Sequence, residues 1–335
     1  DFLMQNGSFR AVDNVSFDIY NNEIVGLVGE SGSGKSTIVK AILRILTAPG
    51  LITDGQILYN KDDILLLDES SMSSLRWKSI SIVNQKALNS LNPLLKIKNQ
   101  ILDTIHTHIS ISETEAMNQC NELMDMVDLD RSYLNSFPHE LSGGMRQRVV
   151  IAIALILEPD LIIMDEPTTA LDVVTEKKII LKILELKKKL GFSILFITHD
   201  LKLILEFADR VGVMQYGKLV DLDYSKVIKS GGNHEYSKKL IDSIPLLEAC
   251  TGTNKDIMID PIITVTGLTK IFQKHSSLFS SKGQQVLNNI SFDLNKNEII
   301  GLVGESGSGK STIAKILTKL LVYEGGMVKF NGVNL

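Results

Sequence analysis

Residues 28–38 read VGESGSGKSTI, and the same letters return unchanged at 303–313. The stretch fits the pattern G-x-x-x-x-G-K-[ST], in which glycines let backbone N–H groups curl around a phosphate. Each copy follows a short apolar run and precedes an amphipathic one, as between a strand and a helix. A single match could be a chance glycine-rich turn, but two identical copies in equivalent contexts make that negligible. The sequence therefore predicts a phosphate-binding loop, present twice.

The repeat extends upstream of the loop and sets the domain layout. Residues 14–27 read NVSFDIYNNEIVGL, and residues 289–302 read NISFDLNKNEIIGL. The spacing between the loop lysines, Lys35 and Lys310, is too long for a solenoid and suits a whole domain plus a linker. We expect a complete first domain at 1–245, a linker at 246–260 and the N-terminal part of a second domain, cut short, at 261–335.

Composition narrows the class of protein. Hydrophobic residues make up 44% and charged residues 22%, values that allow a sizeable core. The net charge of −4 gives no reason to expect nucleic acid, which usually needs a basic face. Two distant cysteines, Cys120 and Cys250, fit neither a disulfide framework nor a four-cysteine metal site, which favours a reducing cytoplasm. The longest apolar run, 149–157, is too short to cross a membrane, and the first residue, Asp1, indicates a start inside a longer reading frame.

Apolar strands alternate with amphipathic helices along the first domain, a pattern that predicts an α/β sheet with parallel strands. Expected strands lie at 23–28, 161–164, 193–198 and, in the second domain, 262–266. Expected helices lie at 35–46 and at 174–190, the latter closed by Gly191.

Two further segments modify this sheet. Residues 56–59 lie between turn residues and suggest an antiparallel β portion, with Asp62-Asp63 as a turn, while 117–130 suggest a helical insert. The expected fold class is therefore α/β, a P-loop NTPase fold with a mostly parallel core sheet, an antiparallel β subdomain and a helical insert.

The loops predict binding of ATP and Mg²⁺. Lys35 would reach the β- and γ-phosphates, the Ser36 hydroxyl would bind Mg²⁺, and the helix N-terminus adds partial positive charge. In the first loop the candidate ATP-binding residues are Gly29, Ser31, Gly32, Ser33, Gly34, Lys35, Ser36 and Thr37. In the second they are Gly304, Ser306, Gly307, Ser308, Gly309, Lys310, Ser311 and Thr312, with Ser311 as the metal ligand.

Two further motifs supply chemistry. Residues 161–166, LIIMDE, form an apolar strand that ends in two acids. Asp165 would hold Mg²⁺, and Glu166 would orient the attacking water. An ordinary solvated strand end is an equally consistent interpretation. Residues 141–147, LSGGMRQ, read as a serine cap and glycine pair opening a helix, either a simple N-cap or an anion site.

The order of these motifs, followed by ITHD at 197–200, resembles the ATP-binding cassette (ABC) ATPases over the whole first domain and the start of the second. The resemblance implies that Ser142, Gly143 and Gly144 close on the nucleotide of a second cassette. It assigns Gln85 to the glutamine loop as a catalytic residue and Mg²⁺ ligand, although NQKA there departs from the commoner FQDP or FQEP.

The resemblance also implies three roles outside the phosphate loops. Asp172, in TALD, fits the loop that lines the nucleotide, and His199 fits the switch histidine that contacts the γ-phosphate. Phe2 is the candidate for stacking on adenine, since its counterpart in the second domain is Phe272; Phe9 is a rival, and simple core packing remains open for both.

Three stretches resemble the ATPases of dipeptide, oligopeptide and nickel importers: RAVD at 10–13, SLNP at 90–93 and HEYSKKLIDSIP at 234–245. The resemblance implies an ATPase that energises an importer of peptides or a related small solute. It implies a peripheral place on the cytoplasmic face of the membrane, permease partners, indirect work with a solute-binding protein, and a second cassette in cis or in trans. Members that carry an Fe–S segment hold several cysteines there, whereas Cys250 stands alone in this sequence.

Other readings remain open. A tandem cassette acting on ribosomes or DNA would carry a charged helical linker or zinc-binding cysteines, and an exporter a different tail. Lys187-Lys188-Lys189 suits a capped helix end better than a nucleic-acid patch, and His106 with His108 lacks further metal ligands. The first loop has the LIIMDE acids and the ITHD histidine in its own domain, whereas neither motif recurs within 261–335. We therefore expect ATP binding here, and hydrolysis with a second molecule or further residues.

Overall fold

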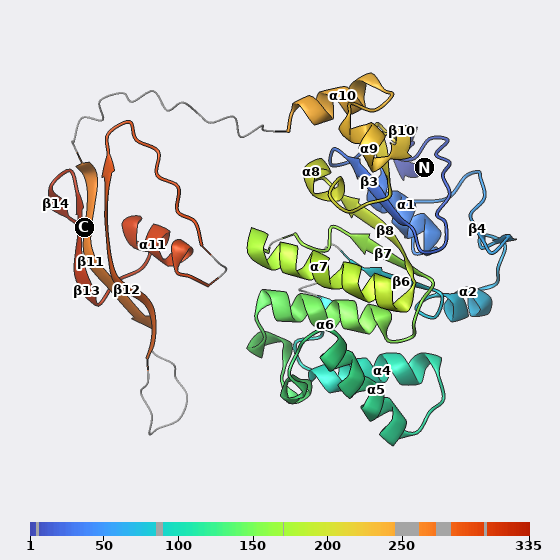
Figure 1. Cartoon of the computed structure of the whole chain (residues 1–335), viewed down its shortest axis with the longest axis horizontal. Helices are drawn as coiled ribbons and strands as arrows, with labels where there is room; N and C mark the ends of the chain where they lie inside the picture. Colours follow the sequence, from blue (N-terminus) through green and yellow to red (C-terminus); the bar gives the residue numbers. More distant parts are fainter. Residues whose placement is uncertain (5–6, 85–89, 170, 245–260, 273–282, 305–306) are drawn as a thin grey trace. The chain divides into compact units, whose positions relative to one another are not determined.

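The computed structural model describes residues 1–335 apart from 5–6, 85–89, 170, 245–260, 273–282 and 305–306. The chain divides into two compact units, Asp1–Leu246 and Leu247–Leu335 (Figure 1). We call them unit one and unit two.

A six-stranded sheet forms the centre of unit one, in the order β10-β9-β3-β8-β7-β6. Its strands are β3 (Ile24–Gly29), β6 (Ile80–Val83), β7 (Leu161–Asp165), β8 (Ser193–Thr198), β9 (Arg210–Gln215) and β10 (Lys218–Tyr224). All neighbours pair in parallel except β10, which runs antiparallel to β9. The predicted, mostly parallel α/β sheet is therefore confirmed, and the phosphate loop leaves one of its inner strands.

Helices cover this sheet, and two short hairpins lie beside it. The helices are α1 (Lys35–Ile42), α2 (Glu69–Leu75), α4 (Ile97–His108), α5 (Glu113–Met126), α6 (Gly143–Leu155), α7 (Val173–Leu190), α8 (Leu201–Ile204), α9 (Ser225–Lys229) and α10 (Glu235–Asp242), with short 3₁₀ turns η1 (Arg131–Asn135) and η2 (Pro138–Glu140). The hairpins are β1 (Phe2–Met4) with β2 (Gly7–Phe9), and β4 (Leu58–Tyr59) with β5 (Asp62–Asp63).

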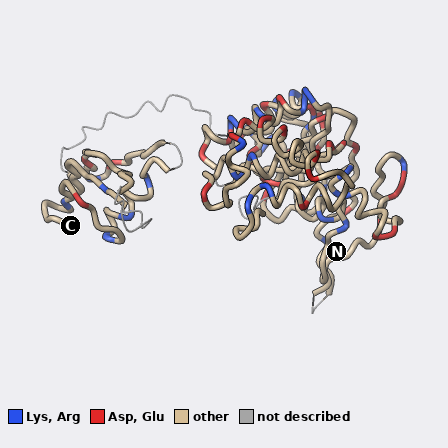
Figure 2. The backbone as a smooth tube through the Cα atoms, turned by 90° about the horizontal axis from the view of Figure 1, so that it is seen from below, with Lys and Arg blue, Asp and Glu red and all other residues tan. Residues whose placement is uncertain are grey.

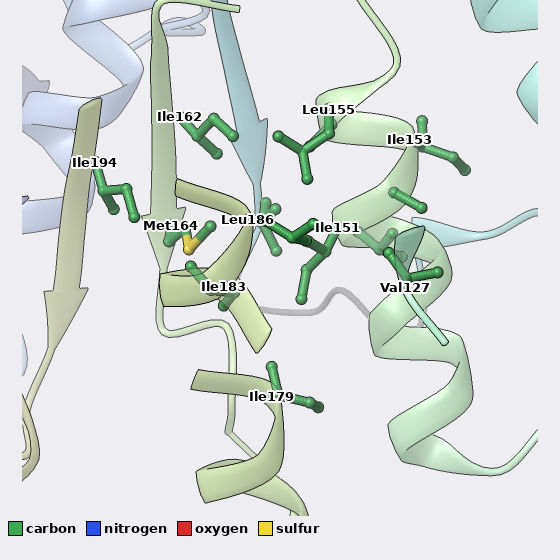
Figure 3. Packing of buried hydrophobic residues seen from close by; sticks show 14 of the residues in the cluster. Val127, Ile151, Ile153, Leu155, Ile162, Met164, Ile179, Ile183, Leu186 and Ile194 are labelled. Carbon is green, nitrogen blue, oxygen red and sulfur yellow. The ribbon is translucent and has the colours of Figure 1, made fainter. Parts of the chain in front are cut away.

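The two faces of the sheet carry separate hydrophobic cores. On one face Ile162 and Ile194 pack with residues of α6 and α7 (Figure 3), and α4 and α5 lie beyond α6 (Figure 1). On the other face Ile163 and Leu195 pack with Ile38 of α1. Successive side chains of a strand point to opposite faces, so a strand covered on both sides is apolar throughout. This burial explains the unbroken apolar run that ends in Asp165.

Several element boundaries match the sequence predictions. β8 spans the predicted 193–198, and Gly191 ends α7 in a left-handed conformation with φ 79°.

The insert helix differs from its predicted bounds of 117–130 at both ends. It begins earlier, because Ser112 and Glu115 form a capping box. It ends before Asp128, whose φ is 52°.

The prediction that Asp62-Asp63 form a turn is wrong. Both residues belong to β5, and the turn lies one step earlier at Asn60 and Lys61, which have φ values of 50° and 77°. Two consecutive residues with positive φ give a tight hairpin whose twist suits antiparallel strands.

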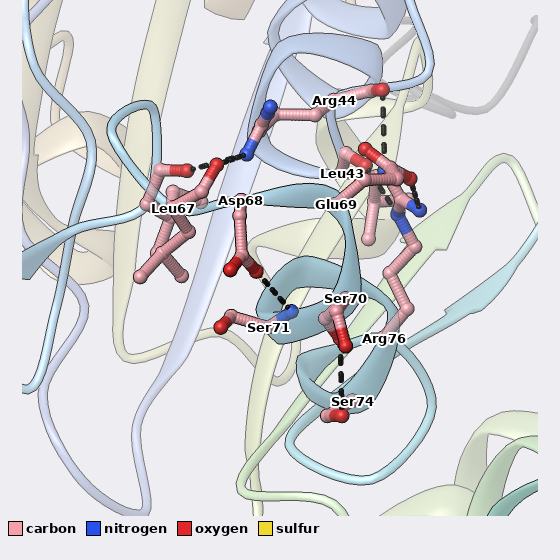
Figure 4. A network of polar contacts seen from close by, with 10 residues as sticks. Leu43, Arg44, Leu67, Asp68, Glu69, Ser70, Ser71, Ser74 and Arg76 are labelled. Carbon is pink, nitrogen blue, oxygen red and sulfur yellow. Dashed lines mark hydrogen bonds and ion pairs between the residues drawn. The ribbon is translucent and has the colours of Figure 1, made fainter.

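The helix predicted at 35–46 ends at Ile42, and a polar network fixes its end (Figure 4). Arg44 has φ 52° and donates hydrogen bonds to the carbonyls of Ile64 (3.2 Å) and Leu67 (2.6 Å). Arg76 donates to the carbonyl of Leu43 at 2.8 Å. These bonds from distant segments hold the C-terminal end of α1 and so help fix the helix that carries the phosphate loop.

Unit two is a four-stranded antiparallel sheet with one helix against it. In sheet order β12-β11-β13-β14, its elements are β11 (Pro261–Phe272), β12 (Gln284–Asn295), β13 (Gly325–Phe330), β14 (Val333–Asn334) and the helix α11 (Lys310–Leu317). Its core joins Val265, Leu287 and Val328 of the sheet to Ile313 and Ile316 of the helix.

Basic and acidic stretches alternate along the backbone trace of unit one (Figure 2). Among the described residues, no helix combines the length and the apolar character needed to span a bilayer.

Candidate functional site

The first phosphate loop connects the end of β3 to the start of α1, and its glycines are required by close packing. Gly29 has φ 151°, and a Cβ there would come within 2.2 Å of the Met214 carbonyl oxygen. Gly34 has φ 102°, and a Cβ there would come within 2.5 Å of the Ala11 carbonyl oxygen. No other residue type tolerates both the backbone angle and the contact, so the loop is shaped by its neighbours as well as by its own sequence.

Lys35 is buried at the start of α1 and its ammonium group points back into the loop. Nζ donates to the carbonyls of Gly29 and Glu30, both at 2.8 Å, and to Ser33 Oγ at 3.1 Å. Burial lowers the pKa of Lys35, and the nearby carboxylates, Glu166 first, act in the opposite direction. The loop thus holds the Lys35 ammonium group among backbone carbonyls and next to the acids of β7.

Asp165, the last residue of β7, is the buried acid of the site. Burial raises the pKa of its carboxyl, and a hydrogen bond with the Ser36 side chain opposes that rise. Its Oδ1 is buried and has no hydrogen-bond partner within the part of the chain that the structure describes. A carboxylate oxygen beside a hydroxyl is the oxygen-donor chemistry that Mg²⁺ prefers.

Other ligands of such an ion would be water, substrate phosphate oxygens and the predicted Gln85, which lies outside the described residues. Among the described residues there is no group of three or more His, Cys, Asp or Glu side chains placed to hold a metal. Mg²⁺ usually keeps water and substrate phosphate oxygens and takes one or two protein ligands. The pair of Ser36 and Asp165 therefore fits this ion, and Ser311 is its predicted counterpart in unit two.

Glu166 and His199, predicted as base and switch, are neighbours at the carboxyl ends of β7 and β8. Glu166 Oε1 lies 3.2 Å from His199 Nδ1, and Thr169 Oγ1 donates to Glu166 Oε2 at 3.1 Å. The Glu166 backbone is left-handed, with φ 47°, and its N–H donates to the carbonyl of Ile197 at 2.9 Å. Such a conformation is uncommon for a residue with a side chain and is concentrated at functional sites.

Ser142, Gly143 and Gly144 open α6, as the serine-cap reading predicts. The Ser142 hydroxyl accepts from the N–H of Met145 at 3.3 Å. A Cβ on Gly144 would lie 2.6 Å from the Thr175 side chain of α7, and Asp172 caps α7 by accepting from Thr175 N at 3.0 Å. Thr175 therefore links the glycine pair to Asp172, two predicted nucleotide contacts that are distant in sequence.

The described structure does not test the site roles predicted for Gln85 and Phe2. Gln85, the predicted glutamine-loop residue, lies outside the described residues. Phe2 belongs to β1, opposite Phe9, and its ring lies so near Gly50 that a Cβ there would come within 2.9 Å of it. Stacking of adenine on Phe2 stays a prediction, with packing against the Gly50 turn as the observed contact.

The second loop repeats the lysine contacts of the first. Lys310 Nζ donates to the Gly304 carbonyl at 2.6 Å and to Ser308 Oγ at 3.4 Å, and Gly309 has φ 96°. Gly307, Ser311 and Thr312 continue the loop into α11, while Ser306 lies outside the described residues.

Two contacts of the first site were not predicted from the sequence. Thr169, three residues after Glu166, bonds its carboxylate, and the DEPTT spacing carries that signal. The backbone of Met214 approaches Gly29 from a strand far along the chain, and no local pattern could have revealed it.

Comparison with known proteins agrees with this geometry. The family model described as ABC transporter matches residues 12–169 and 287–335, more than half of the chain. The chain belongs to the ABC transporter family. Its predicted identity as an ABC cassette is thereby confirmed.

Relatives of this ABC chain carry importer names. The dipeptide transport ATP-binding protein of Caldanaerobacter subterraneus is 41% identical over 262 residues, which cover 78% of this chain and 80% of that protein. The glutathione import ATP-binding protein of Shigella dysenteriae is 35% identical over 364 residues, 99% of this chain and 58% of that protein. The chain therefore spans less than two thirds of the length of the glutathione import protein.

A solved ABC cassette confirms the fold class. The dimeric post-hydrolysis structure of the cassette MJ0796, bound to ADP and Pi, matches with a TM-score of 0.59 and 29% identity. The match covers 66% of this chain and 94% of that chain.

Proposed function

We propose that this ABC chain binds and hydrolyses ATP to energise an importer of peptides or of a related small solute. The observation that carries the proposal is the meeting of three groups at the carboxyl edge of parallel strands. These groups are the Lys35 ammonium, the Asp165 carboxylate with Ser36, and the Glu166–His199 pair. Open α/β sheets bind their ligands at this edge.

ATP binding uses the loop backbone and Lys35. The N–H groups at the start of α1 and the partial positive charge of its N-terminus attract phosphate oxygens. Lys35 already lies among the carbonyls of Gly29 and Glu30, so a small movement of its flexible side chain would transfer its hydrogen bonds to a phosphate.

Hydrolysis uses Glu166 as the residue that orients water. Its carboxylate is fixed by Thr169 and faces His199, which leaves it positioned as a hydrogen-bond acceptor for an attacking water. His199 would contact the γ-phosphate through its second ring nitrogen. Phosphoryl transfer needs little covalent chemistry from the protein and depends on positioning and electrostatic stabilisation.

Ser36 and Asp165 would hold Mg²⁺, with Gln85 as a further ligand from the undescribed segment. When bound, the ion supplies positive charge to the β- and γ-phosphates. Asp165 Oδ1 is then no longer a buried oxygen without a partner, which removes an unfavourable feature of the site.

A second cassette, in cis or in trans, would complete each site with its signature residues. Ser142, Gly143 and Gly144 would reach the nucleotide of that partner, as the dimeric state of MJ0796 supports. Asp172, linked to the glycine pair through Thr175, would line the same junction.

The names of the relatives support a cargo class and a setting for this proposal. Names of dipeptide transport and glutathione import proteins favour small peptides as the imported solute. The chain would then work peripherally on the cytoplasmic face of the membrane, with two permease subunits as direct partners and a solute-binding protein as an indirect one.

Affinity purification of the tagged full chain from detergent-solubilised membranes tests the importer role. We expect two integral membrane permeases to co-purify, and their addition in vesicles to raise the rate of phosphate release. Co-sedimentation with ribosomes and no permease would overturn the importer reading and leave a non-transport cassette.

A further inference from the structure

Thr175 lies in the first turn of α7, where it bonds both carboxylate oxygens of Asp172. Thr175 N donates to Asp172 Oδ1 at 3.0 Å, and Thr175 Oγ1 donates to Asp172 Oδ2 at 2.9 Å. The first bond is the ordinary N-cap of a helix, which Asp172 can make with any residue that has a backbone N–H at this position. The second bond needs a hydroxyl, so the Thr175 side chain fixes the orientation of the Asp172 carboxylate.

The methyl group of the same side chain packs against the glycine pair that opens α6. A Cβ on Gly144 would lie 2.6 Å from Thr175 Cγ2, a separation that real Cβ atoms do not show. Gly144 belongs to α6, and alanine is favoured over glycine within a helix. The glycine is therefore explained by the presence of Thr175, whose β-branched side chain, bonded at its hydroxyl, is not free to rotate away.

Both neighbours of Thr175 have a proposed role at the junction with a second cassette. Gly144 follows Ser142, the cap of α6, and these residues would reach the nucleotide of the partner. Asp172 would line the same junction. The Thr175 side chain thus lies between two segments that are distant in sequence and would act on one nucleotide.

The segment before Asp172 also carries the proposed water-orienting residue. Thr169 Oγ1 donates to Glu166 Oε2 at 3.1 Å, and Leu171 N donates to the Thr168 carbonyl at 3.1 Å. Hydrogen bonds and a few residues of chain therefore connect the start of α7 to Glu166. A displaced Asp172 is expected to disturb the position of Glu166 as well as the junction.

We propose that Thr175 is a positioning residue for ATP hydrolysis by this ABC chain. Its hydroxyl orients Asp172, and its methyl group sets how closely Gly144 approaches α7. One side chain then keeps the two nucleotide-facing segments of unit one in register. The inference rests on the proposed hydrolysis of ATP at a junction of two cassettes, and it gives Thr175 itself no contact with the nucleotide.

Thr175→Val tests the hydroxyl while keeping the shape of the side chain. Valine retains a methyl group toward Gly144 and the backbone bond to Asp172, and it loses the bond from Oγ1. We expect kcat for phosphate release by the full chain to fall about 3- to 10-fold, the effect of one lost hydrogen bond. The Kd of the first loop, measured with a fluorescent ATP analogue in a Lys310→Ala background, should be unchanged.

Thr104→Val is the matched control for this substitution. The Thr104 hydroxyl is also partly buried on a helix of unit one, and it donates to the Gln100 carbonyl at 3.1 Å within α4. This variant should alter neither kcat nor Kd. An unchanged kcat in Thr175→Val, a rise in its Kd as large as the fall in kcat, or an equal fall of kcat in the control would each overturn the inference.

Gly144→Ala tests the methyl contact independently of Thr175→Val. The new Cβ must displace Thr175, so we expect kcat to fall by about 10-fold or more. Thr175→Ser removes the methyl group and keeps the hydroxyl, so alone it should lower kcat by about 2-fold or less. Added to Gly144→Ala, Thr175→Ser should restore kcat to the level of the serine variant, because the clash is gone.

The rescue separates a linked pair from two independent residues. An equal loss of kcat in Gly144→Ala with and without Thr175→Ser would show that Gly144 acts without Thr175, and would overturn the inference while ATP hydrolysis stands. Absence of phosphate release by the parent chain would instead overturn the proposed function, and the inference with it.

Discussion

The two phosphate loops have the same sequence but different surroundings. In unit one the preceding residues form β3, which is buried between β8 and β9, with Ile24 4% and Val28 1% exposed. In unit two the equivalent residues 299–304 form no strand, and Ile299 and Val303 are 97% and 93% exposed. A strand forms by hydrogen bonding to a neighbouring strand, and the described part of unit two offers no such partner to residues 299–304.

The loop and helix, by contrast, are nearly the same in both units. α1 and α11 each begin at the loop lysine, and the glycines before them have φ 102° and 96°. Both lysines donate to the first glycine's carbonyl, at 2.8 and 2.6 Å. The comparison teaches that glycine spacing and helix propensity specify the loop locally, whereas the strand beneath it depends on partners from far along the chain.

Glu166→Gln should give the largest effect and locate turnover in unit one. Loss of the carboxylate that orients water is expected to lower kcat for ATP hydrolysis by about 10²- to 10⁴-fold, with nucleotide binding intact. On one preparation, the rate of phosphate release measures kcat, and titration with a fluorescent ATP analogue measures nucleotide binding. Turnover at the normal rate would show that the second loop, or another base, performs the reaction.

Leu27→Ala and Leu302→Ala form a matched pair in the two copies of the strand sequence. Leu27 is 1% exposed and Leu302 is 51% exposed. We expect Leu27→Ala to cost about 2–5 kcal/mol in the free energy of unfolding, and Leu302→Ala about 0.5 kcal/mol or less. Denaturant unfolding of the full chain measures both, and equal costs would mean that 299–304 is buried in solution.

Lys35→Ala and Lys310→Ala compare the loops as binding sites. Removing a charged donor to phosphate should weaken ATP binding at the first loop by about 10- to 100-fold. The change at the second loop should be smaller, because Lys310 is less buried than Lys35. A two-site titration resolves the effects, and unchanged affinity in Lys35→Ala would contradict the role of the first loop.

Asp165→Asn should give the smallest effect. Unlike the other substitutions, it should stabilise the fold rather than impair the protein. Burial raises the folded-state pKa of Asp165, so its ionised form is disfavoured in the fold. This cost is absent below the unfolded pKa near 4 and develops as the pH rises through the folded value. We expect Asp165→Asn to raise Tm slightly at pH 7 without Mg²⁺ and nucleotide, and not at pH 3; a lower Tm at pH 7 would contradict it.

Much of this site follows from the sequence because its determinants are local. Each motif lies at the end of a strand or the start of a helix, and parallel strands bring such ends to one edge. That rule alone places Glu166 beside His199, although 33 residues separate them, and the structure has them 3.2 Å apart. The strand at 193–198 and the αL glycine at 191 are equally local signals.

What the sequence did not predict comes from contacts between distant segments. α1 stops at Ile42 because Arg44 turns to bond carbonyls some twenty residues later. Gly29 must be glycine because of Met214, and Ser237 of the tail bonds Asp221 of β10. None of these pairs has a fixed spacing, so periodicity and motif reading have no means to find them.

The position of β3 in the sheet has a consequence for how the protein is made. The residues that bond to this strand and its start are synthesised much later. Asn22 bonds Ser193, which lies 171 residues further along the chain, and Ile24 bonds Asp209, which lies 185 residues further along. At translation rates of about 5–20 residues per second, the apolar strand waits on the order of 10–40 seconds beside the ribosome before it can be covered. During that interval it is a target for chaperones or for aggregation, because the strand that carries the loop is made long before the segments that bury it.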